Sequence, residues 1–317
     1  MKFATIGHLL DENTRKQLPQ AWIHQDIVLS PEIDVLGTKG HISGILITAK
    51  DMMSMPIEDV RNQILKTALL LQNTYHVDVI QLGAYTTSVT NGGTWLTQQK
   101  PYTGFVNHGD SYTAAVTCQA VHKAATTLQK DLSACTLAIV GAYGIIGEAA
   151  SKLLVPHFAH SILIGRTKEK FKPLDDVLTG SFETTVSLTT THADIIVTAT
   201  NHPTTLLEPK HLKKHAIVID VSQPPNLGPN ISKTRPDVTR IDGGIVDFPG
   251  TLPIPGMPAG KNFACIAEAM MQALENDRAN HVGSIDLNHL KQTETWAEKY
   301  GFTLNELTNF GQPIPKK

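Results

Sequence analysis

The feature that most constrains this chain is a glycine-containing turn between an apolar run and an amphipathic helix, within residues 137–154. Its glycines, Gly141, Gly144 and Gly147, follow a Gly-x-x-Gly-x-x-Gly spacing rather than the usual Gly-x-Gly-x-x-Gly. In a strand, turn and helix of this kind, the glycines permit the tight turn, the approach of a pyrophosphate and the packing of helix on strand. The helix N-terminus then faces the phosphates. The pattern therefore predicts a dinucleotide-binding Rossmann domain.

The next apolar run, residues 161–165, predicts which dinucleotide binds. Arg166, Thr167 and Lys168 stand at its end, where a carboxylate would otherwise bind the ribose. An arginine at this place accommodates a 2′-phosphate, so NADPH is the expected cofactor. A solvated loop is the other interpretation of these three residues. The expected cofactor contacts come from the glycine turn and from the ends of the strands: Gly141, Tyr143, Gly144, Ile145, Ile146, Arg166, Thr167, Thr200 and Val221.

Three further apolar runs, residues 193–199, 216–220 and 238–242, alternate with helical or loop segments. Alternating strands and helices predict an α/β fold with a doubly wound parallel sheet. We expect this Rossmann domain at residues 116–264. Residues 1–115 should form a smaller α/β N-terminal substrate lobe, with C-terminal helices of residues 265–317 packing back on it.

The N-terminal lobe should contain a strand at residues 2–7, followed by a helix capped by Asp11 or Asn13. A long helix is expected from Pro56 to Tyr75, because apolar residues recur there at helical spacing. Glycine and proline at residues 91–109 indicate a loop, and a helix should follow from Asp110 or Ser111.

Composition excludes several classes of protein. The 317 residues are 41% hydrophobic and 18% charged with a net charge of -2, so a sizeable core is expected and a nucleic-acid partner is not. The N-terminal apolar run is too short for a signal peptide, and the sequence has no 18-residue apolar segment, which favours a cytoplasmic protein with no transmembrane segment. The cysteines and histidines form no recognisable ligand spacing, so no disulfide framework and no metal site are expected.

Cys265 precedes an apolar helical run, residues 266–274. With Asn262 as N-cap it would be the third helical residue, where unpaired backbone N–H groups and the helix dipole lower a thiol pKa. A thiolate there could attack a thioester or aldehyde carbonyl. The other interpretation is a buried core cysteine, since Phe263, Ile266 and Met270 surround it in sequence. For Cys118 and Cys135 a core role is expected.

Taken together, these segments resemble the cyanobacterial long-chain acyl-[acyl carrier protein] reductases, nearly from end to end. The most specific match is Phe263-Ala-Cys-Ile-Ala-Glu-Ala-Met270. Two segments depart from the family pattern: Gly141-Ala-Tyr-Gly-Ile-Ile-Gly147 replaces Gly-Ala-Thr-Gly-Asp-Ile-Gly, and Asp220-Val-Ser-Gln-Pro224 replaces Asp-Gly-Gly-Tyr-Pro. Further matches are Ile6-Gly-His-Leu9, Leu82-Gly-Ala-Tyr-Thr-Thr87, Gly109-Asp-Ser-Tyr-Thr-Ala114, Pro225-Asn-Leu-Gly228 and Asp242-Gly-Gly-Ile-Val246.

The resemblance implies a reaction and its partners. NADPH would reduce a fatty acyl thioester, donated by acyl carrier protein or acyl-CoA, to a fatty aldehyde, with Cys265 as the acylated nucleophile. A downstream enzyme would consume the aldehyde.

Polar residues near position 110 are further catalytic candidates. Ser111 and Tyr112, together with Thr86 from an earlier segment, could donate hydrogen bonds to the oxyanion formed on the thioester carbonyl. His108 could protonate the leaving sulfur. A loop role for His108 and a packing role for Tyr112 stay open. So do two other functions for the chain: an NADP-dependent oxidoreductase of a small alcohol, similar to shikimate or quinate dehydrogenase, and a non-enzymatic nucleotide sensor.

Overall fold

The computed structural model describes residues 1–9, 12–202, 204–250, 252, 254 and 257–314. The chain divides into two compact units: residues 1–112 with 247–303, and residues 113–246 with 304–317. Residues 247–264 thus group with the first unit and 304–317 with the second, which differs from the limits expected from sequence. None of the helices among the described residues has the length and apolar character needed to cross a bilayer.

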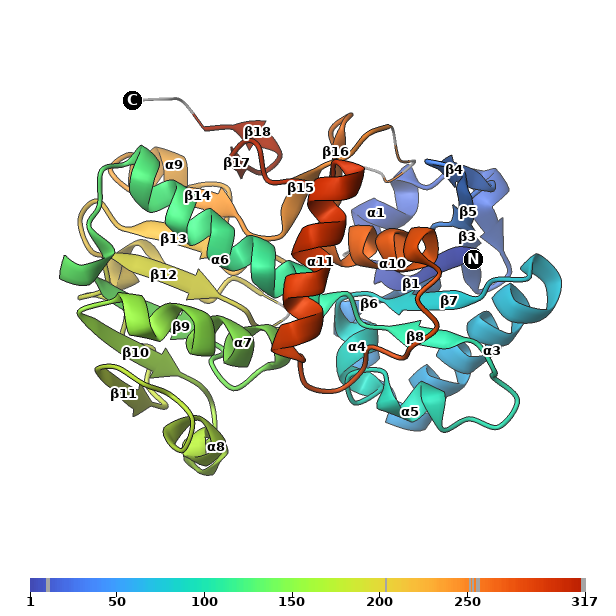
Figure 1. The fold of residues 1–317 in the computed structure, drawn as a ribbon, viewed down its shortest axis with the longest axis horizontal. Coiled ribbons are helices and arrows are strands. Elements are labelled where there is room, and N and C mark those ends of the chain that lie inside the picture. Colours follow the sequence, from blue (N-terminus) through green and yellow to red (C-terminus); the bar gives the residue numbers. More distant parts are fainter. Residues whose placement is uncertain (10–11, 203, 251, 253, 255–256, 315–317) are drawn as a thin grey trace. The chain divides into compact units, whose positions relative to one another are not determined.

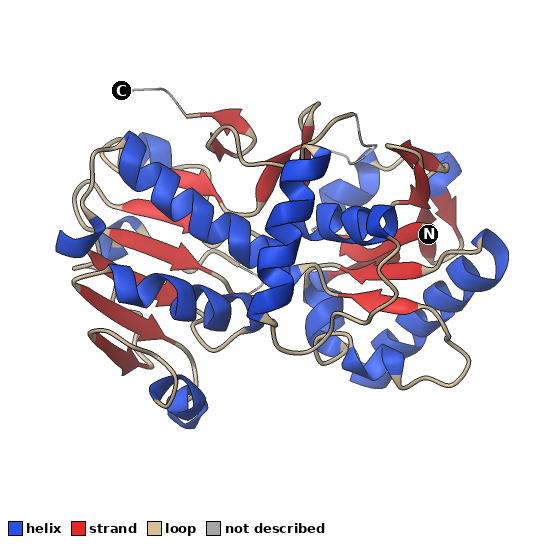
Figure 2. Cartoon of the chain, in the orientation of Figure 1, coloured by secondary structure: helices blue, strands red, loops and turns tan. Residues whose placement is uncertain are grey.

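The second unit is built on a six-stranded parallel sheet in the order β11-β10-β9-β12-β13-β14. Strand order reverses around β9, which confirms the predicted α/β doubly wound parallel sheet. Its strands are β9 (Thr136–Val140), β10 (His160–Ile164), β11 (Phe182–Thr185), β12 (Ile195–Thr198), β13 (Ile217–Asp220) and β14 (Thr239–Asp242). Its helices include α7 (Ile145–Leu154), α8 (Lys172–Asp175) and α9 (Ile231–Thr234), as Figures 1 and 2 show. A short hairpin, β17 (Thr308–Asn309) with β18 (Gln312–Pro313), completes this unit.

Both faces of this sheet are covered. Ala120, Val121 and Ala124 of α6 (Asp110–Thr127) pack with Leu137 and Ile139 of β9 in one buried cluster. A second buried cluster joins alternate residues of the same strands to the loops and short helices of the opposite face. Because strands buried on both faces read as nearly continuous apolar runs, β9, β10, β12, β13 and β14 could be predicted from sequence.

The first unit contains a mixed sheet centred on β1 (Phe3–Leu9). The first half of this strand pairs in parallel with both β5 (Thr38–His41) and β7 (Val79–Leu82), and its second half pairs in parallel with β6 (Ser43–Thr48). The remaining strands of this sheet are β2 (Ile23–His24), β3 (Ile27–Leu29), β4 (Ile33–Val35) and β8 (Phe105–Asn107). Two further strands lie where the chain returns to this unit: β15 (Ile245–Asp247) ends at the first returning residue, and β16 (Lys261–Phe263) follows later.

Helices complete the first unit. The long helix α3 (Ile57–Tyr75) has Pro56 as N-cap, as predicted, and packs on β1 and β6. Asn13 lies inside α1 (Glu12–Gln17) rather than capping it, and Asp11 lies outside the described residues. The other helices are α2 (Ala49–Ser54), α4 (Tyr85–Val89), α5 (Thr94–Thr97), α10 (Ala264–Glu275) and α11 (Leu287–Tyr300). Thus α5 and β8 occupy part of the segment that we expected to be a loop.

Candidate active site

Cys265 is the second residue of α10, which packs on β1 and β7 in the first unit (Figure 1). The prediction of Asn262 as N-cap was wrong, because Phe263 holds the N-cap position. Asn262 belongs to β16, and its buried amide nitrogen lies 3.6 Å from Met270 Sδ. Cys265 is therefore one position nearer the helix start than expected, still within the first turn.

Gly109 packs directly against Cys265. A Cβ atom on Gly109 would lie 2.5 Å from the Cα, the Cβ and the carbonyl oxygen of Cys265. Gly109 also has a φ of +72°, which disfavours a side chain. Only glycine therefore lets the start of α6 approach the start of α10 this closely.

The surroundings of Cys265 raise its thiol pKa from 9 to about 12. Burial is the main cause, and the nearby carboxyl groups of Asp110 and Glu268 act in the same direction. Backbone hydrogen bonds at the helix start lower the pKa, but they are outweighed. The sequence-based expectation of a lowered thiol pKa was wrong, so deprotonation of Cys265 near neutral pH requires a base.

The two carboxyl groups near Cys265 have opposite pKa shifts. Burial and the charge of Glu268 raise the pKa of Asp110 well above its usual range. Burial alone would also raise the pKa of Glu268, but the hydrogen bond and charge of His289 lower it. His289 Nε2 donates to Glu268 Oε1 at 3.2 Å, and the Tyr112 backbone N–H donates to Glu268 Oε2 at 2.7 Å. Two carboxyl groups with opposite pKa shifts thus lie near one thiol.

The other predicted catalytic residues lie in the same unit. His108, Ser111 and Tyr112 are each 1% exposed. Burial lowers the pKa of His108 to about 4, so its ring is neutral at pH 7 and lacks the proton that we expected it to supply. The Tyr112 hydroxyl donates to the Phe302 carbonyl, and the Thr86 hydroxyl to that of Ile6 at 2.9 Å. These two hydroxyls therefore hold backbone in place, whereas Ser111 lines a cavity.

This cavity measures about 530 Å³, and most of the residues that line it are of polar types. His108 and Ser111 line it at one side, and residues of the segment before α11 and of α11 itself form the rest, including Asp277, His281, Asp286 and His289. All of these residues belong to the first unit. The cavity therefore adjoins two of the four residues predicted to be catalytic.

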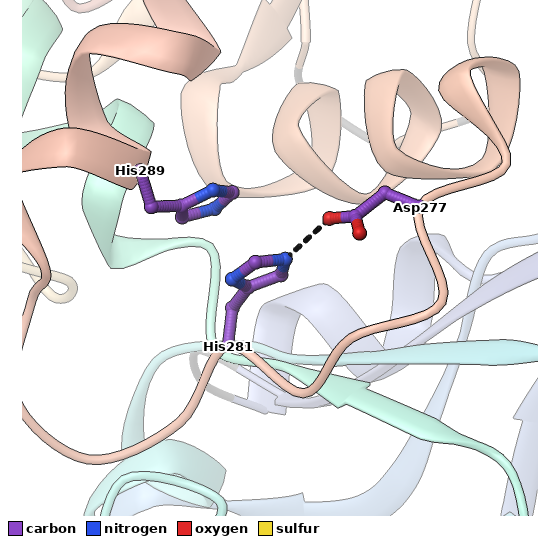
Figure 3. A group of neighbouring side chains, drawn as sticks. All are labelled: Asp277, His281 and His289. Atoms are coloured by element: carbon purple, nitrogen blue, oxygen red, sulfur yellow. Dashed lines mark hydrogen bonds and ion pairs between the residues drawn. The ribbon is translucent and has the colours of Figure 1, made fainter.

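Asp277, His281 and His289 form a group that we did not expect from sequence, with ligand atoms within 4.8 Å of one another (Figure 3). The two imidazole rings are stacked, with centroids 3.5 Å apart and planes 5° from parallel. Nitrogen lone pairs lie in the ring planes, so parallel rings do not converge on one metal ion. Each ring instead donates to its own carboxylate: His281 Nε2 to Asp277 Oδ2 at 2.6 Å, and His289 to Glu268.

In the second unit, the glycine turn has the close contacts expected of a phosphate-binding loop. A Cβ on Gly141 would lie 2.3 Å from the Ala199 carbonyl oxygen, and one on Gly147 would lie 2.0 Å from the Gly141 carbonyl oxygen. Gly144 is the N-cap of α7, whose first turn contains Ile145 and Ile146. The glycine turn thus lies beside the N-terminus of the ten-residue helix α7, and a side chain at Gly141 or Gly147 would clash with the backbone there. These residues fit a dinucleotide pyrophosphate.

The remaining predicted cofactor residues follow three strands of the same sheet. Tyr143 reaches the exposed residues Arg166 and Thr167 after β10. Thr200 follows β12, and its hydroxyl donates to Asn226 Oδ1 at 2.6 Å. Val221 follows β13 and is buried. Because the carboxyl ends of parallel strands share one edge of a sheet, all nine predicted residues line this edge.

A buried ion pair that sequence analysis missed supports this edge. Asp220 Oδ2 accepts from the Leu227 backbone N–H at 3.0 Å, and Arg240 Nη2 lies 3.3 Å from the same oxygen. Asp220 Oδ1 accepts from the Thr198 hydroxyl at 2.7 Å. The carboxylate therefore holds the loop after β13 next to the end of β12. An aspartate at the end of an apolar strand was the only sequence signal for this role.

Comparison with known proteins is consistent with this architecture. Residues 122–243 match the sequence model of the shikimate / quinate 5-dehydrogenase family. The chain is 30% identical over 182 residues to the long-chain acyl-[acyl-carrier-protein] reductase of Synechococcus elongatus, an alignment that covers 54% of this chain and 53% of that protein. It is 26% identical over 255 residues to the aminotransferase PigE of Serratia sp., covering 76% of this chain and 29% of that protein. The chain thus spans about half the length of the first relative and less than a third of the second.

Solved structures that the chain matches include shikimate dehydrogenase 1 from Peptoclostridium difficile, 12% identical over 95% of this chain and 99% of that chain, with a TM-score of 0.43. L-tryptophan dehydrogenase from Nostoc punctiforme is 11% identical over 96% of this chain and 85% of that chain, with a TM-score of 0.46. The family match, residues 122–243, falls entirely in the second unit. The chain therefore carries a Rossmann domain homologous to those of NAD(P)-dependent oxidoreductases.

Proposed function

We propose that the chain is an NADPH-dependent reductase that converts a fatty acyl thioester into a fatty aldehyde through an acyl thioester on Cys265. The observation that carries the proposal is a cysteine in the first turn of a helix, near two carboxyl groups whose pKa values are shifted in opposite directions. Carboxyl groups with pKa values shifted in opposite directions are typical of an acid and a base at one site. The partial likeness to an acyl-[acyl-carrier-protein] reductase supports the same reaction.

Acylation uses both carboxyl groups. Glu268, one helical turn after Cys265, accepts the thiol proton as the sulfur attacks the thioester carbon and a new C–S bond forms. The original C–S bond then breaks, and Asp110 gives its proton to the departing thiol of the acyl carrier protein or CoA. Asp110 thus takes the role that we first assigned to His108, whose ring is neutral.

Aldehyde release returns these groups to their starting states. When bound, NADPH supplies the hydride that reduces the acyl group to the aldehyde level. The C–S bond to Cys265 then breaks, the sulfur recovers its proton from Glu268, and Asp110 recovers a proton from solvent. One thioester, one NADPH and one proton therefore give one aldehyde, one thiol and one NADP⁺. Ser111, which lines the cavity, is our candidate donor to the oxyanion.

A second candidate function is favoured by the family match in the second unit. In this alternative the chain oxidises a small alcohol with NADP⁺, as a shikimate or quinate dehydrogenase does, and Cys265 has no chemical role. The match does not include the segments around Cys265, so it supports the dinucleotide site rather than the substrate. The alcohol substrate therefore requires its own test.

The test is a product screen with the full chain and NADPH. Acyl-CoA and acyl carrier protein thioesters of increasing chain length are supplied, and aldehyde is measured by gas chromatography. We expect aldehyde from the wild type and from the control Cys118→Ala, but none from Cys265→Ser. Aldehyde from Cys265→Ser would refute the covalent route, and turnover of shikimate or quinate by that variant would establish the alternative. Inactivity of the wild type with all of these substrates would favour a nucleotide sensor.

A further inference from the structure

The Tyr143 hydroxyl occupies a position next to the end of β10 that is relevant to cofactor selection. It accepts hydrogen bonds from the backbone N–H groups of Arg166 at 2.6 Å and Thr167 at 2.9 Å. In a Rossmann domain the residue after the second strand contacts the adenosine ribose, and β10 is the second strand here. The phenol oxygen is therefore bonded to the backbone of the two residues at the place in the sequence where NAD-specific domains carry a ribose-binding carboxylate.

The ring of Tyr143 is held firmly in this position. It packs edge-on against Phe171 with centroids 5.1 Å apart. A Cβ on Gly165 would lie 2.2 Å from Tyr143 Cε1, so glycine at position 165 is what admits the ring. The backbone N–H groups of Gly141 and Ala142 both donate to the Ile164 carbonyl, which ties the glycine turn to the end of β10. The hydroxyl is thus a fixed part of the site.

The two accepted bonds determine what the hydroxyl can still do. A phenol oxygen has two lone pairs and one hydrogen. Because both lone pairs accept backbone N–H groups, the hydrogen is the capacity left for a ligand. The 2′-phosphate of NADPH is a stronger acceptor for that hydrogen than the neutral 2′-hydroxyl of NADH, since hydrogen bonds to ionised acceptors are about twice as strong as those to neutral ones. No carboxylate follows β10 directly to repel the phosphate, because Gly165, Arg166, Thr167 and Lys168 come next.

We infer that Tyr143 determines specificity for the 2′-phosphate of NADPH, by donating its hydroxyl hydrogen to the phosphate and by holding the Arg166–Thr167 turn in shape. This inference rests on the cofactor of the proposed function. It extends that proposal by naming the group that distinguishes NADPH from NADH. The cationic side chains of Arg166 and Lys168 then supply charge, while Tyr143 supplies a fixed donor.

The test is nucleotide binding, measured by isothermal titration calorimetry without any substrate. The probes are adenosine 2′,5′-bisphosphate and adenosine 5′-monophosphate, followed by NADPH and NADH. We expect Tyr143→Phe to weaken binding of the bisphosphate about tenfold and of the monophosphate less than about threefold. Tyr102→Phe is the matched control, because it removes a buried phenol hydrogen bond, to the Phe105 carbonyl at 2.9 Å, in the first unit. It should change neither affinity.

Gly165→Ala tests the same inference by another route, because it displaces the ring and keeps the hydroxyl. It should reduce the preference for the bisphosphate as Tyr143→Phe does. An unchanged preference in both variants would refute the inference. Tighter bisphosphate binding in Tyr143→Phe would also refute it and would show that the phenol blocks the backbone donors of Arg166 and Thr167. If the wild type binds neither adenosine nucleotide, the proposed cofactor itself fails. Circular dichroism melting confirms that each variant is folded before titration.

Discussion

At Cys265 the effect of a helix terminus competes with desolvation. The N-terminal end of a helix stabilises a nearby anion by about 0.3–1 kcal/mol, which is less than one pKa unit. Burial and the nearby carboxyl groups of Asp110 and Glu268 act against it and raise the thiol pKa to about 12. The helix effect was visible in the sequence, but the larger opposing effect comes from residues brought in by the fold. The proposed Glu268 base compensates for this unreactive thiol.

Replacing Glu268 tests this account, because two readouts should change in opposite directions. In Glu268→Gln, loss of the negative charge lowers the Cys265 pKa, so we expect iodoacetamide to alkylate Cys265 roughly three- to tenfold faster at pH 9. Reductase activity should fall at least about a hundredfold, because the base is lost. Mass spectrometry of the Cys265 peptide measures alkylation.

Glu275→Gln is the control for this experiment. It makes the same chemical change at the other end of α10, where Glu275 pairs with Lys299 at 2.7 Å. Neither readout should change by more than about twofold, since exposed ion pairs contribute little. A parallel fall of alkylation and activity in Glu268→Gln would indicate a purely structural role for Glu268.

At the level of elements, the glycine turn shows how contact distances restrict sequence. Gly147 lies in the first turn of α7, where the helix contacts the preceding glycine turn and leaves no space for a Cβ. Gly165 has the same restriction against the Tyr143 ring. Each glycine thus permits one close approach that shapes the predicted dinucleotide site.

Gly147→Ala should separate α7 from the turn. Since the added Cβ would lie 2.0 Å from the Gly141 carbonyl oxygen, we expect a loss of about 1–3 kcal/mol of stability and more than about tenfold weaker NADPH binding. Urea unfolding and NADPH fluorescence titration measure the two effects. The neighbouring Glu148→Ala, which removes only the ion pair with Lys152, is the control and should bind NADPH normally. Normal binding in Gly147→Ala would mean that the pyrophosphate does not use this turn.

The elements also show what could be predicted from sequence. Strands β9, β10, β12, β13 and β14 and the helices α3, α6, α7 and α10 were confirmed near their predicted positions, because apolar periodicity and caps identify them. The edge strand β11, with the sequence Phe-Glu-Thr-Thr, was missed since its polar, partly exposed residues carry no apolar signal. The N-cap of α10 was misplaced because Asn262 is a better cap by residue type than Phe263. At the start of α10, tertiary packing rather than the capping preference of the residue type determined the N-cap position.

At the level of the whole molecule, the first unit is discontinuous, since the chain leaves it after residue 112 and returns at residue 247. The candidate active site combines residues 108–112, 265–268 and 277–289, so its parts are up to 181 positions apart in sequence. Local pattern could identify Cys265, but not its pairing with Asp110 or the stacked histidines. Those contacts exist only once α10 packs on β1 and β7 and α11 packs on α10.

The buried Asp110 should make stability depend on pH. A carboxyl group whose pKa is higher in the folded state binds an extra proton on folding, so its contribution to stability is lost as pH rises from about 4 to the raised pKa. Asp110→Asn keeps the neutral shape, and we expect it to be more stable than the wild type at pH 8, with little difference at pH 4. Reductase activity should be lost, because an amide cannot supply the proton.

Asp194→Asn provides the contrast in the second unit. Burial would raise the Asp194 pKa, but hydrogen bonds from Lys213 and from the Thr136 backbone N–H lower it overall. The Asp194 carboxylate therefore contributes to folding stability at pH values above its pKa in the unfolded chain, and this contribution is lost as the pH falls through its lower folded-state pKa. Asp194→Asn should thus destabilise the protein at pH 8. Urea unfolding midpoints at both pH values measure both variants. An Asp110→Asn variant that is less stable at pH 8 would show that Asp110 is ionised.

The most direct test of the central claim is the intact mass of the protein after mixing with an acyl-CoA or acyl carrier protein thioester in the absence of NADPH. The proposed reaction then stops at the acylated enzyme. We predict a mass increase equal to one acyl group in the wild type, which disappears when NADPH is added and is absent in Cys265→Ser. A wild-type enzyme that forms aldehyde but never gains this mass, or a Cys265→Ser variant that gains it equally, would contradict the account.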